Sequence, residues 1–290
     1  MVPVHILTLS CPDRKGVVAS ISKGLVDLDA NILENAEYLA VGNNQGEGSG
    51  EHTFCMRTRF EVEVFDSAEV AAALAERTEA LSAAVNVRRE DHPKRALLMV
   101  SKYDHCLVDL LYRRNSGELP LDIPLVVSNH PDLRDTVVRN GAEFEHVPVT
   151  KDTKPAAEAR LMELVDRHKI DFVVLARYMQ ILSNDLCSKL GGRAINIHHS
   201  FLPGFKGAKP YHQAWERGVK LIGATAHYVT ADLDEGPIIS QDVAPVSHRD
   251  TADQMVVKGR DIERLVLSRA VKAEAEDRIF RIGDRTVIFD

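Results

Sequence analysis

Hydrophobic and polar positions follow two different patterns along this chain of 290 residues. In the first part, apolar and polar residues alternate over short stretches that predict strands, and apolar residues recur at helical spacing between them. The predicted elements are a strand at 4–10, a helix at 17–28, strands at 31–41 and 54–65, a helix at 67–84 and a strand at 85–88. Residues 42–50, which are rich in glycine and asparagine, predict a long hairpin loop. The resulting order βαββαβ is typical of ferredoxin-like domains.

Continuous apolar runs replace this alternation after a charged, proline-containing segment at 88–95. Such runs are typical of strands buried on both faces of a parallel sheet, and helical spacing between them predicts crossover helices. The predicted strands are 96–100, 123–128, 143–148, 172–175 and 194–197; the helices are 105–113, 133–140 and 155–168; edge strands at 219–230 and 238–244, a helix at 251–275 and a hairpin over 278–289 follow. We therefore predict an α/β protein in which a ferredoxin-like domain, 1–90, precedes a Rossmann-like, mostly parallel sheet domain, 91–290.

Composition and charge restrict the classes of partner. The formal net charge is −7 and no dense Lys/Arg block is present, so we expect no nucleic-acid binding. No apolar run approaches the roughly 18 residues of a membrane span, and the N-terminus lacks the pattern of a secretory signal. The four cysteines lie far apart, which indicates reduced thiols. These features predict a cytoplasmic protein with no membrane partner.

Candidate chemistry is concentrated in one stretch, 195–237. Asn196 and His198 lie two residues apart at the end of an apolar strand, so their side chains share one face. His227 ends a second apolar strand, and Asp234 lies seven residues beyond it in a glycine-proline turn. Together these groups can transfer an acyl group to water, because an amide stabilises an oxyanion, an imidazole moves protons and a carboxylate orients water or the imidazole. No serine or cysteine here has the setting of an activated nucleophile, so we expect direct attack by water or by an amine.

Other interpretations of the same side chains stay open. His198, His199, His227 and Asp234 could ligate zinc, but neighbouring histidines on a strand point to opposite faces, so we expect no metal. His227 taken alone fits a core histidine with satisfied hydrogen bonds equally well. His199 fits a structural role better than a catalytic one.

The same stretch resembles the formyltransferase family, whose members use 10-formyltetrahydrofolate. The resemblance rests on Asn-x-His, on Ser-x-Leu-Pro-x-Phe-x-Gly at 200–207, on Thr-x-His at 225–227 and on the aspartate seven residues later, and it covers about residues 95–290. It implies the formyltransferase fold, with Asn196, His198 and Asp234 as catalytic residues. It also implies a pterin pocket and supporting residues, which are Met179, Gln180, Ile181, Leu182, His227 and Val229.

One segment separates this chain from glycinamide ribonucleotide formyltransferases. Those proteins carry a Ser-Gly-x-Gly-Ser-Asn phosphate loop after the first strand of this domain, whereas this chain has Ser-Lys-Tyr-Asp-His-Cys at 101–106. Without the glycines, the backbone N–H groups lose their cradle for a phosphate. The family's usual proline after the catalytic histidine is also replaced, by His199. With Ser-Asn-His at 128–130, these features resemble the formyltetrahydrofolate deformylase family.

That resemblance implies hydrolysis of 10-formyltetrahydrofolate to tetrahydrofolate and formate. These two products would be supplied to one-carbon and purine metabolism. The folate is then the substrate, and no cofactor is implied. Formyl transfer to an amine acceptor and an inactive folate or amino-acid sensor are the alternatives. The complete set of Asn196, His198 and Asp234 argues against the sensor.

The first domain resembles the ACT domain, a small module that binds amino acids at interfaces between paired copies. The matching residues are Asp13, Arg14 and Gly16, in the turn between the first strand and the first helix. Gly16 has no Cβ, so the backbone there can approach a ligand or a partner chain closely. The resemblance implies an amino-acid effector and a homo-oligomer, either a dimer or a tetramer. A ferredoxin-like domain used only for oligomerisation is the alternative.

Overall fold

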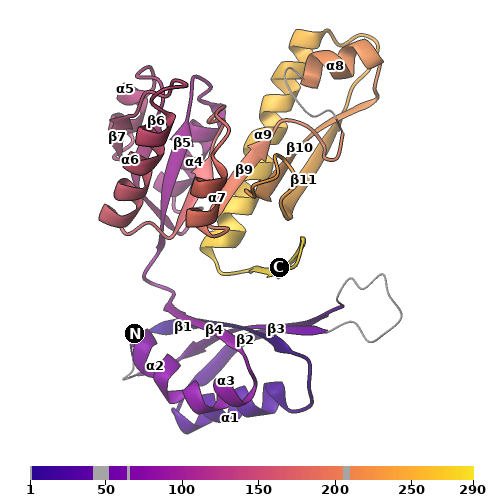
Figure 1. The fold of residues 1–290 in the computed structure, drawn as a ribbon. Helices are drawn as coiled ribbons and strands as arrows, with labels where there is room; N and C mark the ends of the chain where they lie inside the picture. The colour runs from indigo at the N-terminus through magenta and orange to yellow at the C-terminus, as the bar shows by residue number, and fades with distance from the viewer. Residues whose placement is uncertain (1, 42–51, 64–65, 205–209) are drawn as a thin grey trace. The chain divides into compact units, whose positions relative to one another are not determined.

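The chain forms two compact units, Met1–Pro93 together with Asp277–Asp290, and Lys94–Glu276 (Figure 1). The computed structural model describes residues 2–41, 52–63, 66–204 and 210–290, so the predicted loop at 42–50 lies outside the described residues. The C-terminal hairpin, predicted as part of the second domain, clusters with the N-terminal unit. The regulatory and catalytic roles predicted for the two parts remain predictions.

The first unit is a four-stranded antiparallel sheet, in the order β2-β3-β1-β4, packed against helices. Its core joins β1, β3 and the helices through buried side chains such as Leu7, Phe60 and Ile21. The elements are β1 Val4–Pro12, α1 Val17–Asp27, β2 Asn31–Ala40, β3 Thr53–Glu61, α2 Ser67–Ala73, α3 Ala75–Ala80, β4 Ala84–Arg89, β12 Ile279–Ile282 and β13 Arg285–Ile288. The predicted βαββαβ order is confirmed.

Two element boundaries in this unit differ from the prediction. The helix predicted at 67–84 is two short helices that meet at Leu74, a fully buried residue in the core beneath the sheet. The second helix stops at Ala80, because Ser82 takes a left-handed φ of 52° that a helix cannot continue through. The predicted strand at 54–65 ends earlier, at Glu61.

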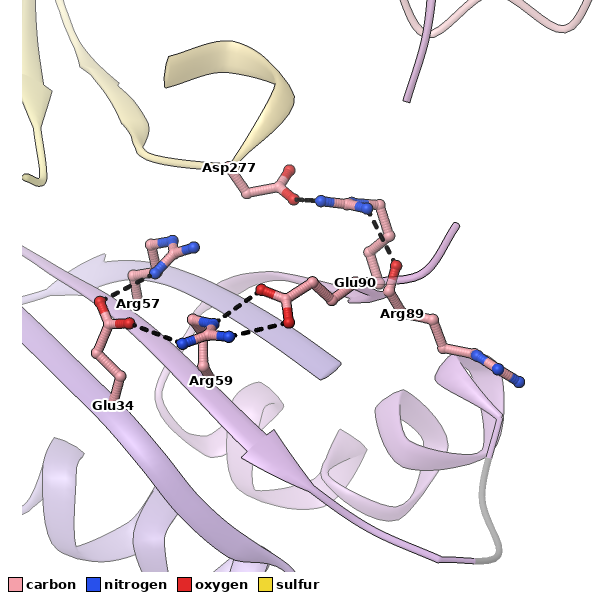
Figure 2. A network of polar contacts seen from close by, with 7 residues as sticks. Glu34, Arg57, Arg59, Arg89, Glu90 and Asp277 are labelled. Carbon is pink, nitrogen blue, oxygen red and sulfur yellow. Dashed lines mark hydrogen bonds and ion pairs between the residues drawn. The ribbon is translucent and has the colours of Figure 1, made fainter. Parts of the chain in front are cut away.

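Charged side chains cover the sheet of the first unit and hold the C-terminal segment on it. Glu34 pairs with both Arg57 and Arg59, and Arg59 also forms two hydrogen bonds with Glu90 (Figure 2). Asp277, just after the last helix, pairs with the guanidinium of Arg88 on β4 at 2.7 Å. This ion pair ties the hairpin β12–β13 to the first unit.

The second unit is a seven-stranded sheet in the order β11-β10-β9-β8-β5-β6-β7. The strands from β9 to β7 are mutually parallel, β10 pairs antiparallel with β9, and β11 pairs antiparallel with β10. The elements are β5 Lys94–Val100, α4 His105–Asn115, β6 Leu121–Ser128, α5 Arg134–Arg139, β7 Glu143–His146, α6 Lys154–Arg167, β8 Phe172–Leu175, α7 Asn184–Leu190, β9 Ala194–His198, α8 Pro210–Arg217, β10 Leu221–Tyr228, β11 Ile238–Pro245 and α9 Ala252–Ala275. The prediction of a mostly parallel α/β sheet is confirmed.

Helices pack on both faces of this sheet (Figure 1). One face packs on α6 and α7 through side chains such as Leu97, Leu161 and Leu186, and α4 and α9 lie on the other. The chain leaves β5 toward β6 in one direction and returns through β8 in the other, so the strand order reverses between β5 and β8. Ligands of open α/β sheets bind at the carboxyl ends of the strands beside such a reversal.

Two helices lie where the apolar pattern predicted none. The first, α7, begins after Ser183, whose side chain accepts from the backbone N–H of Leu186, and ends at Gly191 with a left-handed φ of 57°. These two residues are the usual helix start and stop signals. The second, α8, ends before Gly218, another left-handed glycine. No helix in the described part of the chain is both long and apolar enough to cross a membrane.

Candidate active site

Strand β9 presents Asn196 and His198 at its carboxyl end, and its neighbour β10 supplies His227. Asn196 and His227 are directly paired across the two antiparallel strands. Their side chains meet with Asn196 Nδ2 at 3.2 Å from His227 Nε2. Nδ1 of His227 lies 2.9 Å from the carbonyl oxygen of Tyr228, which can only accept, so Nδ1 carries the hydrogen. Nε2 therefore accepts from the Asn196 amide, which fixes the direction of that amide.

Asp234 reaches the same point from the turn after β10. Its Oδ1 lies 3.1 Å from Nδ1 of His198 and 3.7 Å from Nε2 of His227, the latter too long for a hydrogen bond. The turn folds back so closely on β10 that a Cβ at Gly236 would overlap the carbonyl oxygen of Tyr228. Asp234 itself takes a left-handed φ of 58°, which aspartate tolerates better than most residues.

His198 lies between two oxygen partners. On one side is Asp234; on the other, Nε2 lies 2.8 Å from Oγ of Ser200. The Ser200 hydroxyl donates to the carbonyl of Gly204 at 2.6 Å, so towards His198 it acts as an acceptor. This pattern is complete when both ring nitrogens carry a hydrogen, that is, when His198 is an imidazolium. Ser200 is a site residue that the sequence prediction missed.

Burial and neighbouring groups set the charges of the site. Burial is the largest single influence on Asp234 and opposes its ionisation, but the combined interactions with His198 and His227 outweigh burial and lower the pKa of the carboxyl below its usual value. Burial also lowers the pKa of His199 to about 4, and the charge of Arg177 adds to this effect. Asp234 is thus an anion and His199 neutral near pH 7.

A pocket of about 510 Å³ opens over these side chains. Asn196, His198 and Asp234 line it together with Met179, Gln180 and Ile181 from the predicted pterin-binding loop. The other three predicted residues, Leu182, His227 and Val229, line a smaller adjoining cleft that shares Gln180, Ile181, Asn196 and Asp234 with the main pocket. All nine residues predicted for catalysis and substrate binding therefore gather around one site, while their individual roles stay predictions.

The far wall of the pocket carries a charged cluster that the sequence prediction missed. Glu263 of α9 is only 1% exposed. Its Oε1 accepts from Tyr211 Oη at 2.8 Å, and its Oε2 lies 2.8 Å from Nε2 of His105 and 3.4 Å from Nε of Arg177. Burial opposes ionisation of Glu263, but these partners lower the pKa of its carboxyl. The sequence signal for this cluster was Glu263 itself, a glutamate within the apolar stripe of the long helix predicted at 251–275. Such a position rarely holds an unpaired charge.

The same cluster contains the candidate metal ligands among the described residues. His105, Cys106 and Glu263 have ligand atoms within 4.8 Å of one another. Both oxygens of Glu263 already have donors, and the guanidinium of Arg177 beside them opposes a second cation. Burial also raises the pKa of the Cys106 thiol, which disfavours the thiolate that a metal needs. The donor set fits a polar cluster better than a metal centre.

The residues predicted for regulation lie in the first unit, at the start of α1. Arg14 donates to the carbonyl oxygen of Ala80 at 3.1 Å, and the backbone N–H of Asp13 donates to that of His52 at 2.9 Å. Gly16 has a φ of 92°, and a Cβ there would meet nothing within 4 Å. Backbone conformation, rather than close packing within the chain, is therefore what requires this glycine.

Comparisons with known proteins identify the class of protein to which this fold and this site belong. The family model described as "Formyl transferase" matches residues 94–271. A glycinamide ribonucleotide transformylase 1 from Symbiobacterium toebii is 32% identical, with a TM-score of 0.64 over 68% of this chain and 94% of its own. A formyltetrahydrofolate deformylase from Corynebacterium sp. (strain P-1) is 46% identical over 98% of this chain and 97% of its own length.

A crystal structure of a formyltetrahydrofolate deformylase from Pseudomonas syringae pv. tomato matches the whole of this chain and 95% of its own, with a TM-score of 0.92 at 45% identity. The chain belongs to the formyltetrahydrofolate deformylase family.

Proposed function

We propose that this enzyme hydrolyses 10-formyltetrahydrofolate to tetrahydrofolate and formate in the pocket over β9, and that Asn196, His198 and Asp234 carry the reaction. The observation that carries the assignment is the position of Asp234 beside the His198 imidazole in a pocket that the Asn196 amide also lines. A carboxylate, an imidazole and an amide in this arrangement supply a water-orienting group, a proton donor and an oxyanion donor.

Asn196 is the oxyanion donor in this proposal. One N–H of its amide is held by Nε2 of His227, and the second is left to donate to the formyl oxygen. Because His227 fixes the amide in advance, the donor needs no reorganisation when negative charge develops on that oxygen. His227 thus acts through Asn196 as a positioning residue.

His198 and Asp234 manage the protons. The water oxygen adds to the formyl carbon, and collapse of the tetrahedral intermediate breaks the bond from that carbon to N10. One proton of the water ends on N10 and the other is released when formic acid ionises, so formate leaves as an anion. An imidazolium between Asp234 and Ser200 can give its proton to N10 and recover one from the water.

Substrate binding is assigned to the loop and wall predicted from the family. Met179 and Ile181 are 52% and 63% exposed, an unusual exposure for apolar side chains beside polar catalytic groups. A flat aromatic ligand such as a pterin would cover them. Leu182 and Val229, in the adjoining cleft, would contact the same ring system.

The test is to incubate purified protein with 10-formyltetrahydrofolate, without an acceptor and with a chelator, and to quantify formate and tetrahydrofolate. The proposal predicts release of the two products in equal amounts. Formyl transfer that occurs only after an amine is added would favour a transferase. No turnover with either acceptor, while folate still binds, would favour a sensor.

We further propose that the first unit binds an amino acid and assembles the chain into a dimer or tetramer. The support is the βαββαβ order with a left-handed glycine at the first turn. The edge strand β2 adds three exposed apolar side chains, Leu33, Tyr38 and Leu39, that a second copy would cover. Sedimentation and a thermal-shift screen of amino acids test the two parts separately.

A further inference from the structure

Arg177 combines several features that ordinary packing does not require. It lies two residues after β8, at the reversal of strand order, and it lines the catalytic pocket. Its backbone takes a left-handed φ of 67°, which costs free energy for any residue with a Cβ. Its side chain is 9% exposed. A strained backbone that delivers a buried cation to a pocket indicates a function for that cation.

Glu263 lies beside Arg177 but does not use up its hydrogen-bonding capacity. Nε of Arg177 lies 3.4 Å from Oε2 of Glu263, but it is buried and has no hydrogen-bond partner among the described residues. The hydrogen bonds of Glu263 go instead to Tyr211 and His105. Arg177 therefore keeps its charge and hydrogen-bonding capacity available to a ligand.

Tyr103 fixes the direction of the same guanidinium. The central carbon of Arg177 lies 5.3 Å from the centre of the Tyr103 ring, and that of Arg260 lies 5.7 Å from it. Tyr103 belongs to the segment 101–106 that replaces the glycine loop of the transferases. Two guanidinium groups against one carboxylate, Glu263, leave an excess of positive charge at this end of the pocket.

The reaction explains why a cation is needed there. Hydrolysis, unlike transfer to an amine, produces a carboxylate anion inside the pocket, where Asp234 and Glu263 would repel it. Arg177 influences His199, whose ring centre lies 5.2 Å from that of His198, so its charge acts close to the reacting groups. A guanidinium is well matched to a small carboxylate.

We propose that Arg177, held by Glu263 and Tyr103, forms a subsite for the formate that hydrolysis releases. The subsite rests on the proposed function for its ligand, but it is defined by the residues of the pocket. It also disfavours protonated amines at this end of the pocket, because they carry the same charge as Arg177. Formate should therefore act as a product inhibitor that competes for Arg177.

The direct test is titration of the free enzyme with ¹³C-labelled formate, followed by NMR. We expect saturable binding by the wild-type enzyme. Arg177→Gln should weaken it by about tenfold or more, because one charge-assisted hydrogen bond to formate is lost. Arg177→Lys should retain part of the affinity, because the positive charge remains but the planar guanidinium with its paired N–H donors is lost. Arg177→Gly is the fold-sparing variant, since glycine adopts this φ freely. Arg160→Gln, on α6 and away from the pocket, is the matched control and should bind as the wild type does.

Two results would overturn the subsite. One is the absence of saturable formate binding by the wild-type enzyme; the other is equal formate affinity in wild type, Arg177→Gln and Arg177→Gly. Acetate is the comparison ligand, and the subsite predicts weaker binding of this larger carboxylate. Because the titration needs no turnover, a chain that binds formate through Arg177 but does not hydrolyse 10-formyltetrahydrofolate would refute the proposed function and leave the subsite standing.

Discussion

Each unit of this protein carries a charged network, and the two networks differ in their contact with water. On the sheet of the first unit, Arg59 bridges Glu34 and Glu90 (Figure 2), and the side chains of Arg59 and Glu90 are 30% and 39% exposed. In the second unit, the side chains of Glu263 and Arg177 are 1% and 9% exposed. Both networks contain arginine–glutamate pairs at similar distances.

The free energy that a charged pair contributes depends on its exposure to water. Water screens the pairs that Arg59 forms with Glu34 and Glu90, so their removal costs little. The buried groups have given up their hydration, and each depends on the others to remain charged. Such a cluster is a poor way to gain stability, and its presence beside a catalytic pocket is better explained by the chemistry of the ligand.

Glu263→Ala is the sharpest way to break the buried network. It leaves Arg177 and His105 without their carboxylate, and we expect a loss of about 3–5 kcal/mol in the free energy of unfolding. Denaturant unfolding measures it. Asp261→Ala, on the same helix but with a side chain 62% exposed, is the control and should lose less than about 1 kcal/mol. Equal losses for the two variants would contradict the comparison.

Asn196→Ala tests the oxyanion donor. We expect a fall in kcat of about a hundredfold to a thousandfold, because one preorganised donor to the developing charge is lost. Folate affinity should change little. Asn115→Ala, which removes an exposed amide that bonds to Asn140, is the matched control. Turnover of Asn196→Ala within a few-fold of the wild type would remove this residue from the proposal.

Acid should destabilise the second unit through His199. Its pKa is about 4 in the folded chain, below its ordinary value, so the unfolded chain binds more protons between that value and about pH 6.5. Stability therefore falls as the pH is lowered through this window. In melting curves recorded from pH 7 to pH 4, His199→Asn should flatten the fall relative to the wild type, whereas His248→Asn, at an exposed position, should not.

Glu90→Gln probes the surface network and should have the smallest effect. Arg59 holds Glu90 through two hydrogen bonds of 2.8 and 2.9 Å, but both partners are partly exposed. We expect a loss of about 0.5–1 kcal/mol that shrinks as salt is added. A loss as large as that of Glu263→Ala, or one insensitive to salt, would show that exposure does not separate the two networks.

The sequence predicted the parts of the site that share a strand or a motif. Asn196 and His198 lie on one face of β9, and the aspartate turn follows β10, so periodicity and resemblance were enough. Glu263, Tyr211 and Arg177 come from three separate elements, and only tertiary packing brings them together. The same limit applies to the fold, where the helix pattern at 67–84 carried no sign of the break at Leu74.

The proposed hydrolysis needs the largely buried carboxylate of Asp234 beside His198. The most direct measurement is the single-turnover rate of Asp234→Asn with 10-formyltetrahydrofolate, together with its folate affinity. Asp91→Asn, which neutralises a carboxylate paired with Arg89 at the surface, is the parallel control. We expect a large loss of rate at nearly unchanged affinity for Asp234→Asn and a normal rate for Asp91→Asn. A normal rate for both variants would contradict this expectation.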